Sequence, residues 1–142
     1  QIAGQVMRRW RMSNEEREQT VWLVEHQNAL DGAASRPWSE VQPALAHHWG
    51  LELVEMHVAR VSAGLVAEIA ASSADVLFAR SKLSLPPEVL NPPPLVTGDD
   101  LIRRGMRPGK QFATLLQAAR DAQLNGRIST QDEAFALVEK LR

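Results

Sequence analysis

The chain has 142 residues, 44% of them hydrophobic and 23% charged, and a formal net charge of −1. This is enough chain for one domain or two small subdomains, and it lacks the basic excess of a dedicated nucleic-acid binder. The absence of cysteine excludes disulfides and thiolate metal sites and suits a reducing cytoplasm, and no run approaches the roughly 20 apolar residues that a membrane helix requires.

The first residues indicate a fragment. The chain begins with Gln1 and shows no signal-peptide pattern. Ile2, Val6 and Trp10 already follow a helical spacing. We therefore expect the chain to be part of a longer protein.

Helical signals dominate the first half, where apolar residues recur every three or four positions and no segment alternates with period two. Ser13 followed by Glu16 is the capping-box pattern that starts a helix. We expect that helix to run to about Leu30, because Asp31-Gly32 then favours a stop.

Two further helices are expected before residue 86. One begins at Trp38 and ends near Trp49-Gly50, and the next follows from Leu51, with a break between residues 64 and 73 and a continuation to about Leu85. The apolar stripe of that helix comprises Leu53, Val54, His57, Val58 and Val61.

Two proline clusters, Pro86-Pro87 and Pro92-Pro93-Pro94, mark the clearest boundary. Consecutive prolines lack N–H donors and hold φ fixed, so we expect an extended, semi-rigid connector. This divides the chain into a helical body (residues 1–85), a proline-rich connector (86–94) and a helical tail subdomain (95–142).

The tail is expected to begin with a short helix, capped by Thr97 or Asp99 and running to about Arg104, with Gly105 as its left-handed stop. Pro108 fits the first turn of the next helix. That helix should end at Asn125-Gly126, and its apolar face comprises Phe112, Leu115, Leu116 and Ala119.

A last helix follows, capped by Ser129 or Thr130 with Glu133 completing a box. Its stripe comprises Ala134, Leu137, Val138 and Leu141. The predicted fold class is therefore all-α, a helical bundle followed by a proline-hinged helical tail.

Four histidines, His26, His47, His48 and His57, raise the question of a metal-dependent hydrolase. The chain contains no His-Asp dipeptide, which such hydrolases of the HD type need. His47 and His48 are expected on a helix with side chains about 100° apart, which disfavours a shared ion. His57 lies in an apolar stripe, which favours a hydrogen-bonded core residue. We predict no metal site.

Asp99-Asp100 could hold Mg²⁺ as paired carboxylates. Their place at a helix start instead favours capping of free N–H groups. No nucleophile elbow and no glycine-rich phosphate loop is present. We therefore predict that this part of the protein is catalytically inactive.

Basic residues are the remaining candidates. Residues 95–142 hold eight Lys or Arg against six Asp or Glu, whereas residues 1–94 hold eight against eleven. A helix N-terminus flanked by guanidinium groups favours phosphate, so these side chains are candidate RNA-binding residues or a solvated surface. They are Arg103, Arg104, Arg107, Lys110 and Arg120. Trp10, Trp22, Trp38 and Trp49 lie on amphipathic helices, which favours core packing over base stacking.

Two stretches resemble the bacterial tRNA nucleotidyltransferase and poly(A) polymerase family. The stretch from Met12 to His26, MSNEEREQTVWLVEH, is similar to the helix that follows the family's HD-like body. The stretch from Leu85 to Val138 resembles the family's tail, because the proline connector, TGDDL, the GMRPG turn and a glycine-stopped helix occur in order.

The chain also departs from the family at several positions. Gln27 follows His26 where family members often carry a second histidine, and Val58-Ala59-Arg60 follows His57 where they often carry Arg-Ala-Asp. Both departures remove candidate metal ligands. Lys110 replaces a common proline and adds a positive charge near the turn.

The resemblance implies a cytoplasmic parent enzyme that adds CCA from CTP and ATP with Mg²⁺, or adenosines from ATP alone, to RNA 3′ ends. The catalytic aspartates would lie in an N-terminal head outside this chain, so this fragment would need no cofactor of its own. The body and tail would hold tRNA or other RNA by shape and phosphate. Neither the choice of parent nor autonomous RNA binding follows from the sequence.

Two alternatives remain at this point. The chain could be a helical interaction module that docks on its own catalytic head or forms a homodimer. It could also be a degenerate phosphohydrolase body, although the missing His-Asp dipeptide argues against that.

Overall fold

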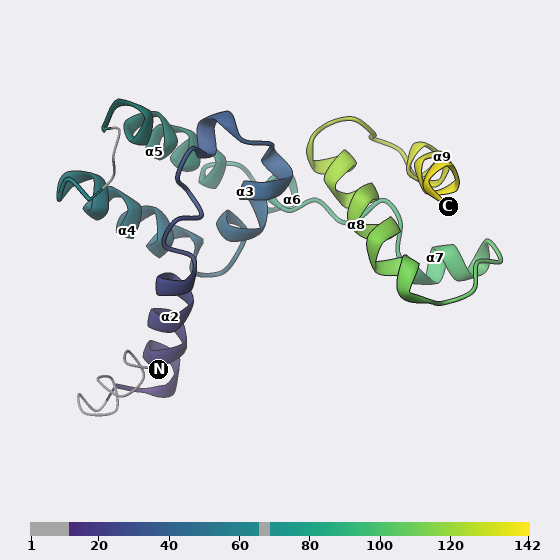
Figure 1. Ribbon diagram of the computed structural model, residues 1–142, viewed down its shortest axis with the longest axis horizontal. Coiled ribbons are helices and arrows are strands. Elements are labelled where there is room, and N and C mark those ends of the chain that lie inside the picture. Colours follow the sequence, from purple (N-terminus) through teal and green to yellow (C-terminus); the bar gives the residue numbers. More distant parts are fainter. Residues whose placement is uncertain (1–11, 66–68) are drawn as a thin grey trace. The chain divides into compact units, whose positions relative to one another are not determined.

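The computed structural model describes residues 12–65 and 69–142, with side chains from residue 73 onward in the second range. It confirms the all-α prediction, since every regular element in these ranges is a helix (Figure 1). None of these helices has the length and apolar character needed to cross a bilayer. The helical spacing expected at Ile2, Val6 and Trp10 lies outside the described residues.

Two compact units make up the chain. Of the described residues, the first unit comprises 12–36, 43–65 and 69–86, and the second comprises 37–42 and 87–142. The second unit therefore includes the beginning of a helix that lies far from the tail in sequence. The division into body, connector and tail stays a prediction, because compactness does not show which segments fold alone.

In the first unit, α2 (Asn14–Glu25) begins at the expected capping box. Ser13 Oγ accepts the N–H of Glu16 at 3.2 Å, and Glu16 Oε2 accepts the N–H of Ser13 at 2.7 Å. The helix ends at Glu25, so the extension to Leu30 was wrong. The cause is a long-range contact. The guanidinium of Arg60 binds the carbonyl of Gln27 and, at 2.9 Å, Oδ1 of Asn28, which stabilises a turn instead.

Helix α3 (Trp38–Leu45) also ends earlier than expected. The chain doubles back after it, and Gly50 begins α4 (Gly50–Ser62) rather than ending α3. Gly50 approaches α3 so closely that a Cβ there would lie 2.2 Å from the carbonyl oxygen of Leu45. The missing side chain therefore permits this return.

Helices α4 and α5 (Ile69–Leu83) pack side by side in the first unit, and α5 also covers the short 3₁₀ helix η1 (Ala33–Ser35) (Figure 1). Gly64 has a φ of 69°, a left-handed conformation, which fits the expected break between the helices. The apolar side chains buried in this unit are Leu30, Ala33, Ala44, Leu45, Leu53, Val54 and Ala79.

Asp75 on α5 is a buried carboxylate, only 3% exposed. Its two oxygens accept the backbone N–H groups of Gly32 and Ala34, each at 2.8 Å. Replacing Asp75 with alanine leaves both donors without an acceptor, so we expect the free energy of unfolding to fall by about 2 kcal/mol. Urea unfolding followed by circular dichroism measures the loss. Asp75→Asn keeps one acceptor oxygen and should lose less; equal losses in both variants would contradict this account.

The sequence predicts an extended proline connector, and this prediction is wrong for part of it. Residues Pro87–Leu90 form the one-turn helix α6, because a proline at the first helical position lacks only an N–H that would be unpaired anyway. The start of α3 belongs to the same unit. Ser39 N–H donates to Asn125 Oδ1 at 3.0 Å, and Gln42 Nε2 donates to the carbonyl of Leu90 at 3.1 Å.

Three helices complete the second unit: α7 (Gly98–Arg103), α8 (Lys110–Leu124) and α9 (Gln131–Leu141). Thr130 with Glu133 forms the expected capping box. Thr97, one of the two caps expected for α7, forms a further box with Asp100, which was not predicted. Pro108 lies before α8 rather than in its first turn, because Gly109 is the N-cap.

The core of this unit lies where α7, α8 and α9 meet. Its buried members are Val96, Leu101, Met106, Leu115, Ala119, Ala134, Phe135 and Val138. On α9, Phe135 is buried and Leu141 is exposed, so the predicted stripe was wrong at its last position. Leu141 in the last turn of α9 is 52% exposed, whereas Val138 one turn earlier is buried.

Candidate nucleic-acid interface

The turn between α7 and α8 places an open helix end next to basic side chains. Gly105 has a φ of 82°, a left-handed conformation, and turns the chain so that the N–H of Met106 reaches the carbonyl of Leu101 at 3.0 Å. Extended backbone leads to Gly109, the N-cap of α8, which has no side chain to cap the helix. The N–H of Phe112 donates to the carbonyl of Gly109 at 3.0 Å. The N–H groups of Lys110 and Gln111 at the start of α8 therefore remain available to an anion.

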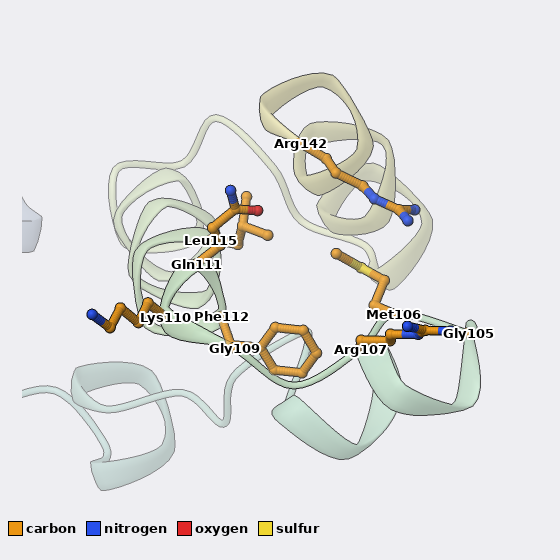
Figure 2. A pocket seen from close by; sticks show the side chains of 9 residues that line it. All are labelled: Gly105, Met106, Arg107, Gly109, Lys110, Gln111, Phe112, Leu115 and Arg142. Carbon is orange, nitrogen blue, oxygen red and sulfur yellow. The ribbon is translucent and has the colours of Figure 1, made fainter.

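A cavity of about 420 Å³ opens beside this turn (Figure 2). Met106, Phe112 and Leu115 supply its apolar surface, and Arg107, Lys110 and Arg142 supply basic groups. Figure 2 shows Lys110 extending away from the other labelled side chains, while Arg142 comes from the end of α9. The cavity thus combines apolar side chains with the basic groups of Arg107 and Arg142, while the ammonium group of Lys110 extends away from them.

Arg107 and Lys110 are both exposed. Neither side chain forms an ion pair within the described ranges, in contrast to Arg142, whose Nη1 lies 3.7 Å from Glu139 Oε2. Sequence reasoning missed Arg142. The short connection between α8 and α9 could have indicated its position. Two helices joined by a short loop pack antiparallel, which brings the end of α9 close to the start of α8.

Arg103 and Arg104 flank the same turn but have partners. Arg103 Nη1 lies 3.2 Å from Asp100 Oδ1, although its side chain is 75% exposed. The guanidinium of Arg104 lies 3.9 Å above the ring of Phe135 and reaches Asp132 Oδ1 at 4.0 Å. Arg104 is therefore held against α9. The exposed guanidinium of Arg103 can exchange its contact with Asp100 for one with a phosphate.

Arg120 is positioned differently from the other four predicted residues. Its Nη1 donates to the carbonyl of Pro92 at 2.6 Å and its Nη2 to Asn91 Oδ1 at 2.8 Å. Burial lowers the pKa of its guanidinium. Arg120 also lies ten residues along α8 from Lys110, about 15 Å at the helical rise. It fastens the connector to α8 and lies away from the cavity.

A family model described as "tRNA nucleotidyltransferase domain 2 putative" matches residues 1–139. The chain belongs to this family. The match confirms the resemblance drawn from the TGDDL and GMRPG motifs, and its range includes every residue lining the cavity except Arg142. No curated protein and no solved structure matches the chain.

The histidines of this tRNA nucleotidyltransferase family domain are arranged differently from the expectation. Helix α3 ends at Leu45, so His47 and His48 lie in a turn with ring centroids 4.2 Å apart, not on a helix with diverging side chains. Among residues 12–65 and 69–142, no three His, Asp or Glu side chains are grouped to hold a metal ion.

His57 is buried in the first unit, as expected for a core residue. Its Nδ1 lies 3.4 Å from Asp31 Oδ1, but neither ring nitrogen forms a hydrogen bond, which corrects the prediction of a hydrogen-bonded histidine. Arg60 Nη1 donates to the same carboxylate oxygen, at 3.3 Å.

Asp100 acts as a cap, as expected of the Asp99-Asp100 pair. Its Oδ2 accepts the hydroxyl of Thr97 at 2.6 Å and the Thr97 N–H at 2.9 Å. These hydrogen bonds, with a smaller contribution from Arg103, lower the pKa of the Asp100 carboxyl. This carboxylate is thus committed to the start of α7.

Proposed function

We propose that this domain grips tRNA, or another structured RNA, through the turn between α7 and α8. Arg107 and Lys110, exposed and without ion-pair partners in the described ranges, carry this proposal. They stand beside the uncapped start of α8, where backbone N–H groups and the helix dipole both favour a phosphate. Arg142 adds a third basic group from α9.

The other predicted RNA-binding residues have supporting positions in this proposal. Arg103 lies on the exposed end of α7 and extends the basic surface. Arg104 and Arg120 hold α9 and the connector, so they keep the surface rigid. Rigid placement matters because A-form RNA is recognised mainly through phosphates and 2′-hydroxyls at fixed spacing.

The parent protein, in this proposal, is a cytoplasmic tRNA nucleotidyltransferase or poly(A) polymerase. Its N-terminal head would bind Mg²⁺ and ATP or CTP and perform the transfer. The domain described here would hold the RNA, and it would need no cofactor for that role. Membership of the tRNA nucleotidyltransferase domain 2 family supports this assignment.

The first experiment is a titration of labelled tRNA with the Arg107→Ala/Lys110→Ala variant over a range of salt concentrations. If both side chains contact phosphates, the slope of log K against log salt should decrease in magnitude by about 2, and affinity near 0.1 M salt should fall by about ten- to a hundredfold. Arg142→Ala should give about half of that change in slope.

Arg127→Ala/Lys140→Ala is the matched control. It removes the same two charges from exposed residues of the second unit that do not line the cavity. An equal loss in the control would show that only net charge matters. No binding by the wild-type domain even at low salt would refute autonomous RNA binding.

A helical interaction module remains the second candidate, and a specific surface favours it. Leu77 is 70% exposed on α5 and borders a cavity of about 370 Å³ between α4 and α5, which Val58, Val61 and Val76 also line. Sedimentation analysis of the wild type and of the Leu77→Lys variant distinguishes the interaction module from the RNA-binding domain. A concentration-dependent dimer that the substitution abolishes, without RNA binding, would favour the interaction module.

A further inference from the structure

None of the residues of helix α2 is fully buried. Aromatic rings form its contact with the turn that follows α3. Trp22 stacks on His26 of the same helix, with centroids 4.3 Å apart and an interplanar angle of 19°. It also stacks on His47 of the α3–α4 turn (residues 46–49), at 4.1 Å and 11°. Trp49 completes the contact, with its ring tilted 5.9 Å from that of Trp22.

The hydrogen bond at His47 defines which ring nitrogen carries its proton. The N–H of Trp49 donates to His47 Nδ1 at 3.3 Å, so Nδ1 is the acceptor and the neutral ring carries its proton on Nε2. A second proton would have to bind Nδ1, where it faces the N–H of Trp49. Protonation of His47 therefore removes this hydrogen bond and places two donors against each other.

The surroundings of His47 also oppose a positive charge. His26 faces it from α2 and His48 from the turn, and burial followed by these two neighbours lowers its pKa below the ordinary value of 6.5. Arg17, Glu18 and Glu25 line the adjoining groove beside Trp22 and Trp49. No carboxylate within the described residues forms an ion pair with His47. On α4, the carboxylate of Glu55 pairs with Arg80 instead, at 3.5 Å.

We propose that the stack of Trp22 on His47 is a pH-sensitive latch, which holds α2 to the α3–α4 turn when His47 is neutral and releases it when His47 is protonated. The released state takes up the proton at the ordinary histidine pKa, and the stacked state only at lower pH. The latch is therefore fully closed above about pH 6.5 and weakens as the pH falls below that value.

Hydrogen–deuterium exchange of the α2 amides tests the latch, after correction for the intrinsic pH dependence of exchange. Protection of α2 should fall by up to about tenfold between roughly pH 7.5 and 5.5, because a free imidazole of ordinary pKa is about ten times more protonated than neutral at the lower pH. Protection of α8 in the second unit should not change in parallel. Unchanged α2 protection would overturn the proposal.

His47→Phe keeps a ring for stacking but cannot titrate, so it should abolish the pH response. His48→Phe, the matched control at the neighbouring position, should retain it. A full response in His47→Phe would overturn the proposal. If that variant does not fold, NMR titration of the wild type tests the proposal instead. The chemical shifts of the α2 amides must change with the same midpoint as those of the His47 ring, and a different midpoint would overturn the proposal.

Discussion

The Leu101→Ala variant is expected to lose about 3 kcal/mol of unfolding free energy, within the range of 2 to 5 kcal/mol for buried leucines. Leu101 is 0% exposed and lies in the core between α7, α8 and α9. The substitution removes apolar contacts and leaves a cavity that the surrounding helices can fill only in part. A unit this small has few other buried side chains to compensate.

Urea unfolding by circular dichroism measures the loss, and amide exchange in α8 assigns it to the second unit. Ile102→Ala is the matched control, because Ile102 is the next residue on the same helix but is 48% exposed. It should lose less than about 1 kcal/mol. Equal losses would show that α7 does not close the core as described.

Gly50→Ala should be comparably damaging, with an expected loss of about 3 kcal/mol through forced overpacking. A Cβ at this position would lie 2.2 Å from the carbonyl oxygen and 2.9 Å from the carbonyl carbon of Leu45. Those atoms are backbone, so the clash cannot be relieved by rotating a side chain. The start of α4 would have to move away from α3.

Gly98→Ala provides the control for this substitution. Its Cβ would meet only Leu116 Cδ1, at 3.9 Å, which is an ordinary contact. Because Gly98 begins α7, alanine there should be neutral or slightly stabilising. Thermal unfolding of both variants compares them directly, and a Gly50→Ala protein as stable as the wild type would contradict the close approach of α4 to α3.

The starts of α2, α7 and α9 could be predicted from the sequence because their determinants are local. Ser13 and Thr130 each cap a helix with a glutamate three residues later, and both predicted boxes form. Thr97, one of the two caps expected for α7, is the cap that the structure shows. Gly105 and Gly126 follow the helices that they were expected to end, and both have a positive φ. Glycine adopts this conformation readily because it has no Cβ, so the signal is local.

Helix ends determined by distant residues could not be predicted in this way. Arg60 stabilises the turn after α2 from 33 positions away, and nothing in the sequence around Gln27 shows that partner. The same reason applies to the candidate site. Arg107 and Lys110 lie at the predicted turn, but the approach of Arg142 and the bonding of Arg120 to the connector depend on how the helices return.

The hydrogen bonds between Ser39 and Asn125 have a consequence for folding during synthesis. The two residues are 86 positions apart, so a ribosome adding about 5 to 20 residues per second makes the second some 4 to 17 seconds after the first. During that time, the N–H of Ser39 in the first turn of α3 lacks the Asn125 side chain that accepts it in the folded protein. Nascent chains halted before Asn125 should therefore leave the beginning of α3 accessible to proteases and chaperones.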